Sequence, residues 1–321
     1  MNDMARDRNP LESLPIDHVL SKITSLYPAP KALDPYVLKA ADDPMGITAC
    51  LWSTDQDLHS VIPWAMRWTG PISLLITTAV DPLSAEHEAL LGRLADLQQR
   101  SALLNATLSA HLVHLAPATP TNPNAFLNLA RLFAQTPRVV LFPGNLSTTP
   151  PKLLYSSLLA QDRGGGRASA AITPAPASPA RRRPAVLTTH GQTGFPFSPL
   201  APVVVGRDDP LWCTERFFLP AGRAADWEEC LWQIWLENFG DVDVRHTRGW
   251  LHDALPGAAP STESASMAKL RRRLAAKFRS ETCVLATRQL AALRSADRAL
   301  DAKKTRWLKR VCRAWTNGPQ A

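Results

Sequence analysis

The feature that most constrains the fold is an alternation of short apolar runs with helical patterns between residues 46 and 142. Four apolar runs are expected to be buried strands. They are residues 47–53, 72–78, 108–116 and 138–142. The segments between them repeat apolar side chains at helical spacing. These helical segments are residues 57–68, 84–104, with Ser84 as the expected N-cap, and 124–135. Strands alternating with helices are typical of a parallel sheet, so the sequence predicts an α/β fold whose mixed, mostly parallel sheet is flanked by helices.

A polar turn, Ser53-Thr54-Asp55-Gln56-Asp57, follows the first predicted strand. Neither GxGxxG nor GxxxxGK[ST] occurs there, so no motif supports a dinucleotide-binding or P-loop site. Ligands of open α/β sheets lie over the carboxyl ends of the strands. Candidate binding residues at this end are therefore Trp52, Ser53, Thr54 and Asp55. The same residues also fit an ordinary turn that binds no ligand.

Positive charge is concentrated near the C-terminus. The chain carries a net charge of +8, but residues 267–313 hold fifteen Lys or Arg and three Asp or Glu, which leaves a net charge of −4 for the rest. From Ser266 the pattern predicts a long basic helix or helix pair. Its expected apolar stripe is Met267, Leu270, Leu274 and Phe278. Packing against the domain and binding of acidic membrane headgroups both fit such a tail. Nucleic acid is not the expected partner, because no nucleic-acid-binding motif accompanies the charge.

The five cysteines are too scattered for a zinc site, which needs closely paired ligands. Their odd number argues against a full disulfide framework, although one bridge is compatible with it. The first fifteen residues lack the apolar core of a secretory signal. No apolar run reaches the roughly 18 residues of a membrane-spanning helix, so no transmembrane segment is expected.

Three parts of the chain follow from these patterns. Residues 1–45 form an N-terminal extension, residues 46–256 the α/β domain, and residues 257–321 the basic helical tail. Within the domain, residues 163–184 contain no acidic side chain and few large apolar ones, so this insertion is expected to be disordered. After it, the apolar run 203–205 predicts a strand and residues 226–238 predict a helix, with a strand after Gly240.

Several segments resemble glycosyltransferase family 49. The opening ITACLWSTDQDLHSVIPWAMRWTGPISLLITT matches the family's first strand, a helix that ends before a Gly-Pro pair, and a second strand. TNPNAFLNLARLFAQTPRVVLFPGNL resembles the family's asparagine-rich helix and the strand that leads to its metal motif. TERFF, DWEECLWQIWLENFGDVDV and GWLHD resemble later, acceptor-side segments. The resemblance covers roughly residues 46–160 and 184–256.

The resemblance implies a GT-A-like glycosyltransferase that takes a nucleotide sugar, with a UDP sugar as the expected donor, and inverts the anomeric carbon. It implies a glycan or glycoprotein acceptor and Golgi or secretory-pathway residence, with a cytoplasmic location as the alternative because no signal or anchor is recognised. In the family an Asp-x-Asp motif holds Mn²⁺ against the diphosphate, since hard cations prefer carboxylate oxygens. Here the matching positions are Pro143-Gly144-Asn145, which leaves Asn145 and His252 as the implied metal ligands and His246 as a rival. Further donor-binding residues on this basis are Asn124, Asn128, Arg245 and Arg248.

Inverting transfer needs a carboxylate that deprotonates the acceptor hydroxyl. The candidates are Asp226 and Glu229, beside Trp227, which is a candidate for stacking on an acceptor sugar. Each has a structural alternative. Asp226 stands where a helix N-cap is expected, with Glu229 as the reciprocal member of a capping box, and Trp227 belongs to a tryptophan-rich segment of the kind that forms cores.

Two functions therefore remain open. One is an active nucleotide-sugar transferase with an altered metal shell, in which basic side chains such as Arg245 and Arg248 bind the diphosphate. The other is a catalytically inactive GT-A-like domain that binds a glycan or a protein.

Overall fold

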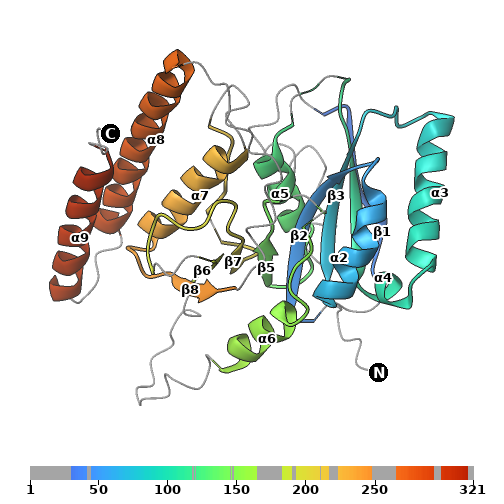
Figure 1. Ribbon diagram of the computed structural model, residues 1–321, viewed down its shortest axis with the longest axis horizontal. Helices are drawn as coiled ribbons and strands as arrows, with labels where there is room; N and C mark the ends of the chain where they lie inside the picture. The colour runs from blue at the N-terminus through green and yellow to red at the C-terminus, as the bar shows by residue number, and fades with distance from the viewer. Residues whose placement is uncertain are drawn as a thin grey trace. The chain divides into compact units, whose positions relative to one another are not determined.

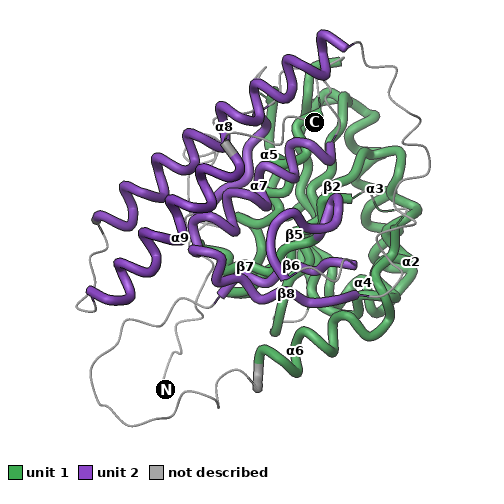
Figure 2. Tube along the Cα trace, turned by 60° about the vertical axis from the view of Figure 1, so that its left-hand side comes forward, with its two compact units in different colours: residues 1–182, 202–210 green, residues 183–201, 211–321 purple. Residues whose placement is uncertain are grey.

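The computed structural model describes residues 30–41, 45–117, 119, 121–144, 146, 148–164, 183–189, 193–209, 211–216, 223–247, 265–292 and 298–316. The chain divides into two compact units, which Figure 2 shows in different colours. Unit 1 comprises residues 1–182 and 202–210, and unit 2 comprises residues 183–201 and 211–321. The basic tail therefore belongs to the same unit as the segments that precede it.

Unit 1 contains the predicted strands and helices together with two further elements, β1 and α6 (Figure 1). Its described strands are β1 (Ala32–Leu38), β2 (Ile47–Thr54), β3 (Ile72–Thr78), β4 (Leu108–His114), β5 (Arg138–Leu141) and β7 (Val203–Gly206). Its described helices are the 3₁₀ turn η2 (Leu58–Ser60), α2 (Val61–Trp68), α3 (Ala85–Gln99), α4 (Ala102–Thr107), α5 (Pro123–Leu132) and α6 (Leu154–Gly164).

The strands of unit 1 form a mixed, mostly parallel sheet in the order β1-β4-β3-β2-β5-β7. β4, β3, β2 and β5 are parallel, whereas β1 runs antiparallel to β4 and β7 antiparallel to β5. Every residue of β3 and β4 is buried, as expected for parallel strands that are covered on both faces. The predicted α/β class is confirmed.

The strand order reverses at β2. From β2 the chain proceeds to β3 and β4 on one side, and α5 then returns it to β5 on the other side. The backbone N–H of Phe142, just after β5, donates to the carbonyl of Cys50 in β2 at 3.2 Å, so β5 ends beside the middle of β2, and β2 continues for four more residues. Such a reversal creates a crevice at the carboxyl ends of the strands, where open α/β sheets bind ligands.

β1 lies in the segment that the sequence set apart as an N-terminal extension. It pairs with β4, with an irregularity in register between Asp34 and Leu38. Pro35 removes a backbone donor, and Tyr36 adopts a left-handed φ of 55°. Both features interrupt the alternation of a regular strand, which explains why no strand was expected there.

The helical prediction for residues 84–104 is correct at its start and wrong in its continuity. Ser84 is the N-cap of α3, since its hydroxyl accepts from the backbone N–H of His87 at 3.2 Å. The helix ends at Gln99, and α4 begins after Ser101, whose hydroxyl accepts from Leu104 N–H at 3.4 Å. A second capping hydroxyl thus starts a separate helix.

Unit 2 is built mainly of helices. Its described elements are β6 (Ala185–Thr188), α7 (Arg223–Glu237), β8 (Asp243–His246), α8 (Ala265–Ala292) and α9 (Arg298–Thr316), with β6 parallel to β8 (Figure 1). The basic tail is the predicted helix pair, α8 and α9. Leu270 is 45% exposed, so the predicted apolar stripe is wrong at this residue. The buried side chains of α8 lie further along the helix: Thr282, Cys283, Ala286 and Leu290.

Two disulfides, Cys213–Cys230 and Cys283–Cys312, lie in unit 2, one more than the sequence suggested. The fifth cysteine, Cys50, is a buried free thiol in β2, and burial raises its pKa well above the ordinary value. Across the described residues, none of the helices has the length and apolar composition needed to cross a membrane.

Candidate functional site

The carboxyl ends of β2, β3 and β4 form a continuous polar row in unit 1. The strand register pairs Thr54 with Thr77 and Thr78 with His114. Asp55, directly after β2, accepts a hydrogen bond from the Thr78 hydroxyl at 2.7 Å, and its backbone N–H donates to Thr77 O at 3.1 Å. The turn after β2 is therefore fixed to the end of β3 by both side chain and backbone.

Of the predicted binding residues 52–55, the first three end β2 and Asp55 begins the turn after it, and they differ in exposure. Ser53 is buried and its hydroxyl donates to Thr54 O, so it serves the turn itself. Trp52 is half-buried and packs against Phe126 of α5, with ring centroids 5.5 Å apart. The indole Nε1 of Trp52 is buried and has no hydrogen-bond partner among the described residues. Since a buried N–H without an acceptor is costly, Trp52 is the residue of this turn that a bound ligand would satisfy.

The segment after β5 lies on the other side of the strand reversal. It begins with Pro143 and Gly144. A Cβ added at Gly144 would meet no atom within 4 Å, which indicates open space beside its backbone. Asn145, the implied metal ligand, lies outside the described residues, as do His252 and Arg248.

The two asparagines implied as donor-binding residues, Asn124 and Asn128, occupy one face of α5 and are buried, with exposed fractions of 0% and 6%. A third polar residue of the same helix, Arg131, was not anticipated. Its guanidinium donates to the carbonyls of Gly206, Arg207 and Asp209, so it fixes the segment after β7. α5 therefore carries three buried polar side chains among its apolar ones.

In unit 2 the two candidate bases on α7, Asp226 and Glu229, differ in their burial and in their hydrogen bonds. α7 begins at Arg223, so Asp226 lies within its first turn, and both the N-cap and the capping-box interpretations are wrong. Arginine and alanine are good helix formers, and they extend the helix before Asp226. One carboxylate oxygen of Asp226 accepts from the backbone N–H of Arg216 at 2.8 Å, which holds the segment before the helix.

Glu229 lines a cavity of about 430 Å³ in unit 2 and is 2% exposed. Its Oε1 accepts from Arg279 Nε at 2.8 Å, whereas its Oε2 is buried without a hydrogen-bond partner among the described residues. Burial raises the pKa of Glu229, although the Arg279 guanidinium opposes this rise. Arg271 and Arg272 also line the cavity, so the buried carboxyl of Glu229 shares the cavity with basic side chains.

The remaining candidate residues of unit 2 are Trp227, Arg245 and His246, and they differ in burial and in their partners. Trp227 is fully buried and its indole N–H donates to Ala201 O at 2.7 Å, so its ring belongs to the core and offers no face to an acceptor sugar. Arg245 of β8 donates from Nε to Asp243 at 2.7 Å, which neutralises part of the charge expected to bind diphosphate. His246, the rival metal ligand, is exposed at the end of β8.

Arg279 of α8 was missed by sequence reasoning. Its guanidinium contacts the rings of Phe195, Trp232 and Trp315 at 5.5–5.8 Å and bridges the carboxylates of Glu228 and Glu229. In the sequence, Arg279 cannot be distinguished from the solvent-exposed arginines of the basic tail. The pattern of α8 alone does not show which arginine contacts carboxylates fifty residues earlier.

Comparison of the whole chain with models of protein families found no match, and comparison with curated proteins found none either.

Proposed function

We propose that the chain is an inverting glycosyltransferase whose unit 1 binds a nucleotide-sugar donor, a UDP sugar in the first instance. The observation that carries this proposal is the strand reversal at β2. It places the end of β2, Trp52–Asp55, and the segment after β5, which has open space beside Gly144, on two adjacent strands. Open α/β sheets use this position for nucleotides.

The residues at the reversal supply contacts that suit a nucleoside. The indole N–H of Trp52 is a buried donor that a base carbonyl or ribose oxygen would accept. The carboxylate of Asp55 is held by Thr78 at 2.7 Å and accepts hydrogen bonds, as ribose hydroxyls require. Together, a donor and an acceptor at the end of β2 favour a polar ligand over an apolar one.

The diphosphate needs positive charge. The Pro143-Gly144 pair brings no carboxylate for a cation, so in this proposal Mn²⁺ relies on Asn145 and His252, which the resemblance implies, or basic side chains such as Arg245 and Arg248 replace it. The metal would stabilise the departing nucleoside diphosphate if present.

In the proposed reaction the acceptor hydroxyl oxygen attacks the anomeric carbon while the bond to the diphosphate oxygen breaks. The hydroxyl proton passes to a carboxylate, and the nucleoside diphosphate leaves. Glu229 suits the proton-accepting role better than Asp226, because it lines a cavity, has a raised pKa and retains an unbonded Oε2. Asp226 is instead engaged by Arg216.

A Golgi or secretory location for this activity remains part of the proposal. Two disulfides in unit 2 support it, because disulfides persist in oxidising compartments and are rare in the cytosol. A glycan or glycoprotein is the proposed acceptor.

The test is calorimetric titration of the full chain with UDP and a panel of UDP sugars, first with Mn²⁺ and then with EDTA. We expect binding that Trp52→Ala weakens at least about tenfold, the equivalent of one lost hydrogen bond. Asp96→Asn, on the exposed face of α3, is the control and should leave the affinity unchanged. Absence of binding under both conditions would refute the donor site, whereas binding in EDTA would favour basic side chains over a metal.

A catalytically inactive domain that binds a glycan or a protein is the second candidate. The replacement of the two motif carboxylates by Pro143 and Asn145 and the ion pair of Glu229 with Arg279 favour it. Release of UDP from a bound UDP sugar, with and without glycan acceptors, separates the two. Donor binding without turnover, and without any effect of Glu229→Gln, would favour the inactive domain.

A further inference from the structure

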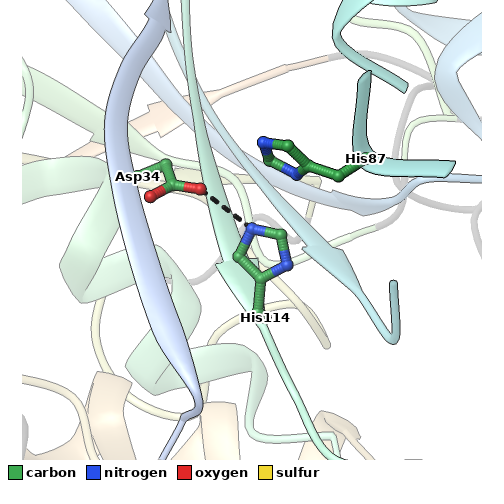
Figure 3. A group of neighbouring side chains, drawn as sticks. All are labelled: Asp34, His87 and His114. Carbon is green, nitrogen blue, oxygen red and sulfur yellow. Dashed lines mark hydrogen bonds and ion pairs between the residues drawn. The ribbon is translucent and has the colours of Figure 1, made fainter. Parts of the chain in front are cut away.

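Three potential metal ligands from separate parts of the chain converge beside β4 in unit 1. Asp34 comes from β1, His87 from the first turn of α3 and His114 from the end of β4 (Figure 3). One ligand atom of each residue lies within 4.8 Å of the corresponding atoms of the other two. Because Asp34 and His114 are 80 residues apart, only the fold brings this group together.

The hydrogen bonds of His114 fix its protonation pattern. Its Nδ1 lies 2.7 Å from the carbonyl of Val80, and a carbonyl only accepts, so Nδ1 carries a proton. A neutral ring then presents the lone pair of Nε2, which faces the Asp34 carboxylate at 2.9 Å. Two acceptors at this distance need a cation between or beside them, either a second proton on His114 or a metal ion.

His87 distinguishes these two cations. Its Nδ1 is buried and has no hydrogen-bond partner among the described residues, and its ring centroid lies 5.1 Å from that of His114. A proton on His114 would satisfy Asp34 and leave His87 unsatisfied. A metal ion would take a lone pair from all three side chains, so it is the cation that accounts for the whole group.

The geometry points to a binding site for a divalent transition metal, and we propose Zn²⁺ as its occupant. Two imidazoles and one carboxylate match the ligands that zinc takes, and three protein ligands leave a position for water. Two ligands about 2.1 Å from one tetrahedral ion are about 3.4 Å apart, so His114 Nε2 and Asp34 Oδ2, 2.9 Å apart here, would separate by about 0.5 Å on binding. The Val80 carbonyl holds the ring of His114 as an outer-sphere partner holds a metal-ligating histidine.

The ion would join β1 to β4 and α3. Hydrogen bonds link this site to the polar row at the carboxyl ends of the strands: His114 bonds to Val80 O, Val80 N–H donates to the Thr78 hydroxyl, and that hydroxyl donates to Asp55. The bound ion should therefore slow amide exchange in β1, the strand that Pro35 and Tyr36 make irregular.

The experiment uses the full chain without a histidine tag, stripped with EDTA and dialysed. Zn²⁺ is titrated by calorimetry, and Co²⁺ is added as a spectroscopic probe of the ligand set. We expect one Zn²⁺ per chain, visible Co²⁺ absorption, a raised midpoint of thermal unfolding and slower exchange in β1.

His87→Ala and Asp34→Asn should lower the Zn²⁺ affinity by more than the roughly 10–100-fold that loss of an outer-sphere partner costs. The alanine at position 87 lies in a helix, where it is well tolerated, so the variant is expected to fold. His59→Ala, at an exposed histidine of η2, is the matched control and should bind as tightly as the unaltered chain.

Failure to bind Zn²⁺ or Co²⁺, or equal binding by the His87→Ala variant and the control, would overturn the proposal and leave a protonated His114–Asp34 pair. None of these readouts involves a nucleotide, so this result and that of the donor titration are independent.

Discussion

His111, at the centre of β4, makes a sharp prediction about acid sensitivity. The backbone N–H of Tyr36 donates to its Nδ1 at 2.9 Å, so Nδ1 is an acceptor and the ring proton resides on Nε2. That proton points to the Ser73 hydroxyl at 3.2 Å, and Ser73 donates in turn to Ala130 O at 2.6 Å. Every position around this fully buried ring therefore suits the neutral form.

Burial lowers the pKa of His111 from 6.5 to about 3. Between these values the unfolded chain binds a proton that the folded chain excludes, so the free energy of unfolding falls as the pH falls below 6.5. The loss approaches about 1.4 kcal/mol for each pH unit. From pH 7 to pH 5, this single group should cost about 2 kcal/mol of stability.

The assay is urea unfolding, followed by circular dichroism at pH 7 and pH 5, of the unaltered chain and of His111→Asn. Asparagine keeps an acceptor for Tyr36 N–H but does not titrate. The variant will be less stable at both pH values, yet its loss between them should be about 2 kcal/mol smaller. Equal pH dependence of the two proteins would refute the assignment of a buried neutral histidine.

Two further predictions concern unit 2. Arg279→Lys should lower the free energy of unfolding by about 1.5–3 kcal/mol, which is the contribution of one charge-assisted hydrogen bond. Lysine lacks the planar guanidinium that binds Glu228 and Glu229 together. Urea unfolding measures the change, and an unchanged midpoint would contradict the prediction. Gly240→Ala should lower the thermal midpoint, since φ is +76° and the new Cβ would lie 2.7 Å from the ring of Trp307, at a cost of about 1–3 kcal/mol. The control, Gly92→Ala within α3, meets no atom within 4 Å and should stabilise by about 0.5–1 kcal/mol.

Local periodicity was sufficient where an element is regular and buried. β2, β3, β4 and β5 are continuous apolar runs covered on both faces, so each was predicted from its own residues. The capping role of Ser84 was also predicted, because its partner is the N–H three residues later. By contrast, β1 was not predicted, because it contains a proline and a residue with left-handed φ, which local sequence patterns do not associate with a strand. Its pairing with β4 is a long-range contact.

In the candidate site, too, some features could be predicted from local sequence and others depend on long-range contacts. The α/β class and the polar segment Trp52–Asp55 could be predicted from the residues alone, because a strand and the residues that follow it are adjacent in the chain. The reversal of strand order at β2, the ion pair of Glu229 with Arg279, and the 2.9 Å distance between Asp34 and His114 appear only in the folded chain. These contacts join residues 50 to 80 positions apart. Their selection depends on sheet order and helix packing, which are set by the burial of the whole apolar surface and leave no periodic signal in either partner alone.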